Sequence, residues 1–111
     1  MPNLKTTVWI TTQFEGIHFW SSAPAEVGFL RHPHRHIFHV KLEVTVHHDD
    51  RDVEFILLKR RVDDYIAERK DLFSGSKSCE MMARTLLLEF NAESVEVSED
   101  GENGARVCKS Q

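Results

Sequence analysis

The sequence predicts an α+β fold in which an antiparallel four-stranded sheet carries two helices on one face, in the order strand, strand, helix, helix, strand, strand. Two kinds of periodicity lead to this prediction. Residues 34–46 alternate between apolar and polar side chains, which is the period of a strand with one buried face. Residues 54–69 and 78–91 repeat apolar side chains every three or four positions, which is the period of an amphipathic helix.

The first half of the chain predicts two strands joined by a loop. Residues 5–20 are rich in Thr, Val, Ile, Trp and Phe, which favour a half-buried pleated surface. Residues 21–33 contain prolines, a glycine and small residues and predict a loop, and residues 47–52 predict a polar turn. Between these two segments, the apolar side of the second strand consists of His36, Phe38, Val40, Leu42, Val44 and Val46.

The second half predicts two helices and a hairpin. The expected apolar positions of the first helix are Phe55, Leu58, Val62, Tyr65 and Ile66. Those of the second helix are Met81, Met82, Thr85, Leu86, Leu88 and Phe90. Ser78 is the expected N-cap of this second helix, and the acidic Glu80 lies favourably in its first turn. Residues 94–110 predict a strand, a glycine-containing turn and a strand.

Composition narrows the class of protein. A chain of 111 residues suits a single domain, residues 1–111. Its net charge of −4, without a run of Lys and Arg, argues against binding to nucleic acid. No apolar stretch could cross a membrane, and the N-terminal residues lack the apolar segment of a signal peptide, so we expect a cytoplasmic protein without a membrane partner. Two cysteines, Cys79 and Cys108, are too few for a disulfide scaffold.

The histidines of the second strand suggest a metal site. His34 and His36 are two residues apart in a strand, so their rings leave the same face about 6–7 Å apart at Cα. Both rings can then reach one ion at bond lengths of about 2.0–2.1 Å. His18 in the preceding strand would lie opposite them if the two strands pair antiparallel. Three neutral imidazoles with one open position describe a catalytic zinc site.

A second interpretation remains open from the pattern alone. The same histidines would then be only the polar start of a strand in a metal-free structural protein. The other histidines are expected to be solvated under either interpretation; they are His32, His39, His47 and His48.

Five segments, in order along nearly the whole chain, resemble a known enzyme family. They are FEGIH (14–18), HRHIFHVKLEV (34–44), DVEFILLK (52–59), SCEMMA (78–83) and VEVSEDGENG (95–104). Together they resemble the 6-pyruvoyl-tetrahydropterin synthase and 6-carboxy-tetrahydropterin synthase family, zinc enzymes of the tunnelling fold. The resemblance implies a homo-oligomer with its sites at subunit interfaces.

The resemblance also implies the roles of individual residues. It implies zinc on His18, His34 and His36, and a pterin-type ring held by Glu99. A carboxylate suits that role because it can accept two parallel hydrogen bonds from a 2-amino-pyrimidinone edge. Glu80 would lie near the same pocket, or would serve only as a charge in the first turn of its helix.

The chain departs from the family pattern at the residues that transfer protons. Leu30 stands where the family has a catalytic cysteine, and the inter-helix motif DHxxLN is absent. Glu26 is the nearest carboxylate to that position, and His32 is a second candidate base, with His39 as a further one. The expected function is therefore a zinc-dependent lyase acting on dihydroneopterin triphosphate or a related pterin. The alternative is a metal- and pterin- or purine-binding member of the same fold without lyase chemistry.

Overall fold

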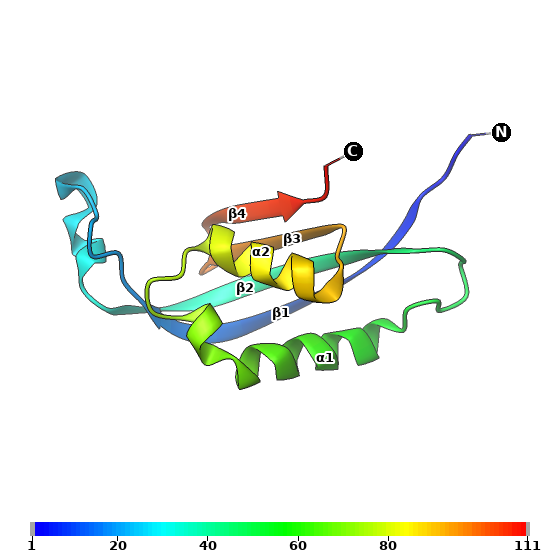
Figure 1. The fold of residues 1–111 in the computed structure, drawn as a ribbon, viewed down its shortest axis with the longest axis horizontal. Helices are drawn as coiled ribbons and strands as arrows, with labels where there is room; N and C mark the ends of the chain where they lie inside the picture. Colours follow the sequence, from blue (N-terminus) through cyan, green and yellow to red (C-terminus); the bar gives the residue numbers. More distant parts are fainter. Residues whose placement is uncertain (1, 111) are drawn as a thin grey trace.

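The computed structural model describes residues 2–110 and confirms the predicted fold class. One antiparallel sheet has its four strands in the order β1-β2-β3-β4 (Figure 1). The strands are β1 (Thr6–His18), β2 (His34–Val46), β3 (Ser94–Glu99) and β4 (Asn103–Cys108). The second strand therefore starts and ends where the alternation predicts it.

Two helices cover one face of the sheet. The first, α1 (Phe55–Glu68), packs beside β1, and the second, α2 (Cys79–Phe90), packs over β3 and β4 (Figure 1). Ser78 caps α2 as expected, because its side-chain oxygen accepts a hydrogen bond from the backbone N–H of Met81 at 3.2 Å. Glu54 caps α1 in the same way, by accepting from the N–H groups of Ile56 and Leu57.

The core lies between the helices and one face of the sheet. The even-numbered residues of β2 point to this face, and five of them are buried and alternate with exposed or half-buried neighbours: Phe38, Val40, Leu42, Val44 and Val46. They meet the buried side chains of both helices, including Leu58 and Val62 from α1 and Met82 and Leu86 from α2. Removing these apolar side chains from water is the main source of stability.

The structure corrects the expected loop and the end of the first strand. Within residues 21–33, the segment Ala25–Arg31 forms a short 3-10 helix, η1, that projects from the end of the sheet (Figure 1). The first strand ends at His18, not at residue 20, because β2 begins at its pairing partner His34. After His18, the backbone forms hydrogen bonds with a different segment: the N–H of Phe19 donates to the carbonyl of Gly75 at 2.9 Å. A second 3-10 turn, η2 (Lys70–Phe73), follows α1.

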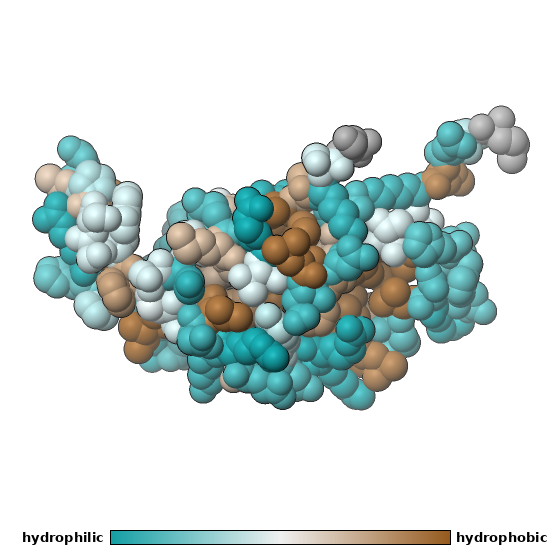
Figure 2. All heavy atoms as spheres, viewed as in Figure 1, coloured by the Kyte–Doolittle hydropathy of each residue, from teal (hydrophilic) through white to brown (hydrophobic). Residues whose placement is uncertain are grey.

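The expected apolar faces of the helices are partly wrong. Met81 and Leu88 are 53% and 71% exposed, and Phe55 of α1 is 54% exposed. Met81 and Leu88 are seven residues apart, so they share one side of α2, and that side faces away from the sheet. The residues of α2 that are buried are Cys79, Met82, Ala83, Leu86 and Leu87. The exposed apolar side chains form separate patches on a mostly hydrophilic face (Figure 2).

The absence of a side chain at Gly16 leaves room for a core residue, Phe38, directly beside the histidines. It pairs with His36 across the β1–β2 ladder, and the ring of Phe38 lies over it. A Cβ at position 16 would lie 3.0 Å from Cε2 of Phe38 and 3.1 Å from the carbonyl oxygen of Phe73. The buried Phe38 ring can therefore pack closely against Gly16, and its centroid lies 5.2 Å from that of the His18 ring.

Two leucines of α2 provide a matched test of this packing. Leu86 is fully buried and Leu88 is 71% exposed, although both lie in the same helix. We expect Leu86→Ala to lower the free energy of unfolding by about 2–5 kcal/mol, because it leaves a cavity in the core. Leu88→Ala should change it by no more than about 0.5 kcal/mol. Urea denaturation of the two variants measures the difference, and equal destabilisation would contradict the described orientation of α2.

Candidate metal centre

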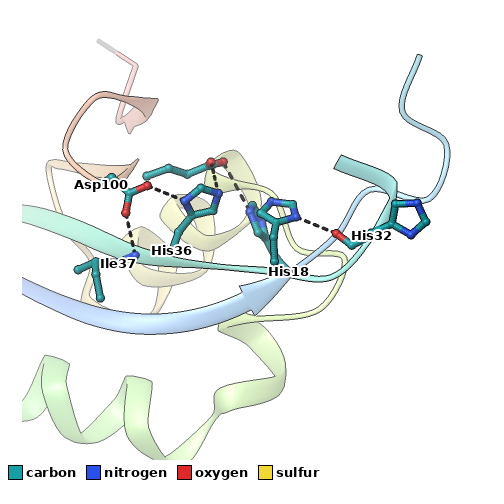
Figure 3. Close-up of polar contacts among 7 residues, drawn as sticks. His18, His32, His36, Ile37 and Asp100 are labelled. Atoms are coloured by element: carbon teal, nitrogen blue, oxygen red, sulfur yellow. Dashed lines mark hydrogen bonds and ion pairs between the residues drawn. The ribbon is translucent and has the colours of Figure 1, made fainter. Parts of the chain in front are cut away.

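The pairing of β1 with β2 brings three histidines together at one end of the sheet. His18 and His34 are direct partners in the ladder, and His36 lies two residues further on the same face of β2. One ring nitrogen from each histidine lies within 4.8 Å of the others. The three side chains that the sequence predicts as metal ligands therefore converge on one point, as Figure 3 shows for His18 and His36.

Hydrogen bonds fix the orientation of two of the rings. Nδ1 of His34 lies 2.8 Å from the backbone carbonyl of His32, and Nδ1 of His36 lies 2.6 Å from Oδ2 of Asp100 (Figure 3). A carbonyl and a carboxylate only accept hydrogen bonds, so each Nδ1 must be the donor and carries the proton. In the neutral ring the lone pair is then on Nε2, which is the state that binds a metal ion.

Two of the Nε2 atoms are buried without a partner. Among residues 2–110, Nε2 of His18 and Nε2 of His34 have no hydrogen-bond partner. A buried polar atom without a hydrogen bond costs free energy, so such atoms call for an explanation. A metal ion bound at this point would satisfy both atoms at once. The residues present therefore fit a metal ion of the kind that imidazole prefers.

The environment of His18 keeps its ring neutral. Burial lowers the pKa of His18, while the negative charge of Glu99 partly opposes this shift. The neighbouring rings of His34 and His36 lower the pKa of His18 further, because their positive forms would repel an imidazolium. A neutral ring at physiological pH is the form that coordinates a metal ion.

Asp100 is a functional candidate that the sequence reasoning missed. It lies in the turn between β3 and β4, and its Oδ1 accepts from the N–H of Ile37 at 3.0 Å while Oδ2 holds His36. Its own N–H donates to the carbonyl of Ile37 at 2.7 Å. The Ile37 N–H bond and the His36 bond lower the pKa of Asp100, which favours the carboxylate. The only signal in the sequence is an aspartate directly after Glu99, in a turn where its φ of 56° suits Asp.

A cavity of about 440 Å³ opens beside the histidines. Its lining includes His18 and His34 together with Glu80 and Glu99, the two carboxylates expected near a bound ring. Leu30, at the position where the resemblance predicts a cysteine, is also part of the wall. The start of α2 and the end of β3 thus both contribute residues to the wall of this cavity.

Cys79 belongs to this cavity as well, although it is far from the histidines in sequence. Cys79 is the first residue of α2, directly after the N-cap Ser78, and this end of the helix lines the cavity. Burial raises the pKa of the Cys79 thiol to about 11, and the negative charges of Glu99 and Glu80 contribute. The thiol is therefore neutral at physiological pH and is a poor nucleophile there.

The two expected catalytic residues lie outside this cavity wall. Glu26 is exposed on η1, and the side chain of His32 is exposed with its ring away from the centre (Figure 3). The backbone carbonyl of His32, not its ring, contacts the centre through His34. His39 is exposed on β2, on the face of the strand opposite to His36.

No protein-family model matches the sequence, and no curated protein is significantly similar to it. Within residues 2–110, no helix has the length and apolar character needed to cross a membrane.

Removing either β2 histidine tests the centre directly. We expect His34→Ala and His36→Ala to abolish equimolar metal binding, because each removes one of three ligands. His39→Ala is the matched control, since it lies on the same strand but on the other face. Metal content is measured by mass spectrometry after purification without an affinity tag. Equal metal content in all three variants would refute the centre.

Asp100→Asn tests whether the hydrogen bond from Nδ1 of His36 to Asp100 strengthens metal binding. An amide has a single acceptor oxygen, so it cannot accept from both His36 and Ile37 as the carboxylate does. We expect the affinity for zinc to fall about 10–100-fold, as is typical when the hydrogen-bond partner of a metal-binding histidine is lost. Competition with a chromophoric chelator measures this affinity. Glu102→Gln in the same turn serves as the control and should bind zinc like the wild type.

Proposed function

We propose that the protein is a zinc-dependent enzyme of the 6-pyruvoyl-tetrahydropterin synthase type, acting on dihydroneopterin triphosphate or a related pterin. One observation carries this proposal: three convergent imidazoles, two with unpartnered buried nitrogens, lie beside a cavity with two carboxylates. The resemblance of five sequence segments to that family supports the same conclusion, because these segments contain the three histidines and the two glutamates of the site.

Zinc is the metal that best suits this set of ligands. Three histidines leave one position of a tetrahedral ion for a water molecule or a substrate oxygen. When bound there, zinc would polarise substrate oxygens and make removal of a neighbouring proton easier. His18, His34 and His36 would hold the ion, and Asp100 and the His32 carbonyl would orient two of their rings.

The cavity suits a small polar ring. Its volume of about 440 Å³ lies within the range of small-molecule sites, which is about 300–1,000 Å³. Glu99 and Glu80 each offer a carboxylate to the amino and N–H groups of a pterin or purine edge. A ring held there would have its side chain beside the histidines, where the chemistry takes place.

A specific observation favours a second candidate function, which is binding of the same ligands without lyase activity. Lyase chemistry needs a base near the reacting carbon. The side chains of Glu26 and His32 are exposed and outside the cavity wall, and the Cys79 thiol is neutral at physiological pH. Apart from the proposed metal ligands, the candidate bases that remain on its described wall are the carboxylates Glu80 and Glu99 and the amine of Lys77.

The open edge of the sheet supports the proposed homo-oligomer. β1 forms one edge of the sheet over 13 residues, and β4 forms the other. A long edge strand presents unpaired N–H and C=O groups that readily pair with a strand of another chain. We propose that copies of this chain associate through these edges, with the sites at the subunit interfaces.

Incubation of the zinc-loaded protein with dihydroneopterin triphosphate tests the proposed enzyme. We expect a change in pterin absorbance with the wild type that is lost in His34→Ala and retained in His39→Ala. Absence of turnover by a folded, zinc-replete sample would exclude the lyase.

Thermal unfolding with added pterins then tests the second candidate. A ligand at about 100 times its Kd stabilises the folded state by about 2.7 kcal/mol, which raises Tm measurably. An unchanged Tm with pterins and guanine analogues would exclude ligand binding as well.

A further inference from the structure

The carboxylate of Glu99 lies directly beside the ring nitrogens of the histidine centre, which binding of a substrate ring alone does not require. It is the last residue of β3 and pairs with Phe38, so its side chain is on the face of the sheet that carries the histidines. Its Oε2 lies 3.2 Å from Nε2 of His36, and its Oε1 lies 3.9 Å from Nε2 of His18. The carboxylate therefore spans two of the three nitrogens that face the centre.

The hydrogen bonds around His36 create a conflict that a cation resolves. Asp100 accepts the proton of Nδ1, so in the neutral ring Nε2 carries a lone pair. The Glu99 oxygen that faces this Nε2 also carries lone pairs and only accepts. Two acceptors at 3.2 Å repel each other unless a proton or a metal ion lies between them. The unpartnered Nε2 atoms of His18 and His34 belong to a group of three histidines whose ligand nitrogens lie within 4.8 Å of one another, and Glu99 borders this group beside His36 and His18. A divalent ion held by the three histidines would therefore also have the Glu99 carboxylate beside it.

The spacing agrees with shared coordination. In a tetrahedral zinc site with bonds of about 2.0–2.2 Å, any two ligand atoms are roughly 3.3–3.6 Å apart. The distance of 3.2 Å between Glu99 and His36 is close to this value, and the distance of 3.9 Å to His18 exceeds it slightly.

We propose that Glu99 is a direct ligand of the metal in the ligand-free protein, so that the centre consists of three histidines and one carboxylate. This inference rests on the metal centre of the proposed function and extends it. It gives Glu99 a role that differs from anchoring the ring, because a carboxylate with one oxygen on the metal cannot offer both oxygens to the two parallel N–H groups of the ring edge. The fourth metal position is then occupied by the protein until a ligand displaces the carboxylate.

Glu99→Gln tests this assignment, with Glu80→Gln as the matched control from the same cavity. The neutral amide is similar in shape but is a much weaker metal ligand. We expect Glu99→Gln to lower zinc affinity at least about 10-fold in a chelator competition, a loss no smaller than that seen when a supporting group is removed. It should also change the visible absorption spectrum of the cobalt-substituted protein, which reports the ligands. Glu80→Gln should leave both measurements unchanged.

The outcomes separate this inference from the proposed function. If Glu99→Gln binds zinc as tightly as the wild type and has the same cobalt spectrum, Glu99 is not a ligand, while the three-histidine centre stands. If the wild type itself binds neither zinc nor cobalt, the proposed function fails. Circular dichroism checks folding, and Glu99→Asp is a second variant that keeps the charge but withdraws the oxygens. If Glu99→Gln does not fold, zinc affinity is measured for Glu99→Asp instead. Wild-type affinity in Glu99→Asp would then overturn the assignment.

Discussion

The pairing of His18 with His34 is the contact on which the candidate site depends. It sets the register of the whole β1–β2 ladder, from these histidines to the pair of Thr6 with Val46. Because side chains alternate between faces, a shift of one residue would move either the histidines or the core residues of one strand to the opposite face. The apolar residues from Phe38 onward bury one face of β2, so the free energy of core formation also holds the histidines in position.

Acceptor groups surround the histidine centre, and this determines its chemistry. The carbonyl of His32 and the carboxylate of Asp100 take the Nδ1 protons of two rings and leave their Nε2 atoms facing inward. Burial keeps His18 neutral, and Glu99 adds a negative charge at the same point. A site with this many lone pairs and few protons is complementary to a cation, which is why a metal ion explains it better than a hydrogen-bond network would.

The site contains only part of what the resemblance implies. The three histidines and the carboxylates Glu80 and Glu99 lie around one cavity. Leu30 lies in the wall of that cavity at the position where a cysteine is expected. Cys79, at the start of α2, lies in the same wall, and the pKa of its thiol is raised. The candidate metal centre therefore has direct structural support, and the proposed ring binding and metal binding would both use the carboxylate of Glu99.

The sequence by itself determined the order of the two helices and four strands and the three candidate metal ligands, because both depend on local spacing. Alternation located β2, and the two-residue spacing of His34 and His36 ensured that both rings share a face. Only the tertiary structure decided which groups complete the centre. Asp100 and Cys79 arrive from a turn and a helix start that are distant along the chain, and no local pattern encodes their approach. The outward side of α2, with Leu88 exposed, was likewise decided by packing against β3 and β4, because the helix is apolar on more than one side.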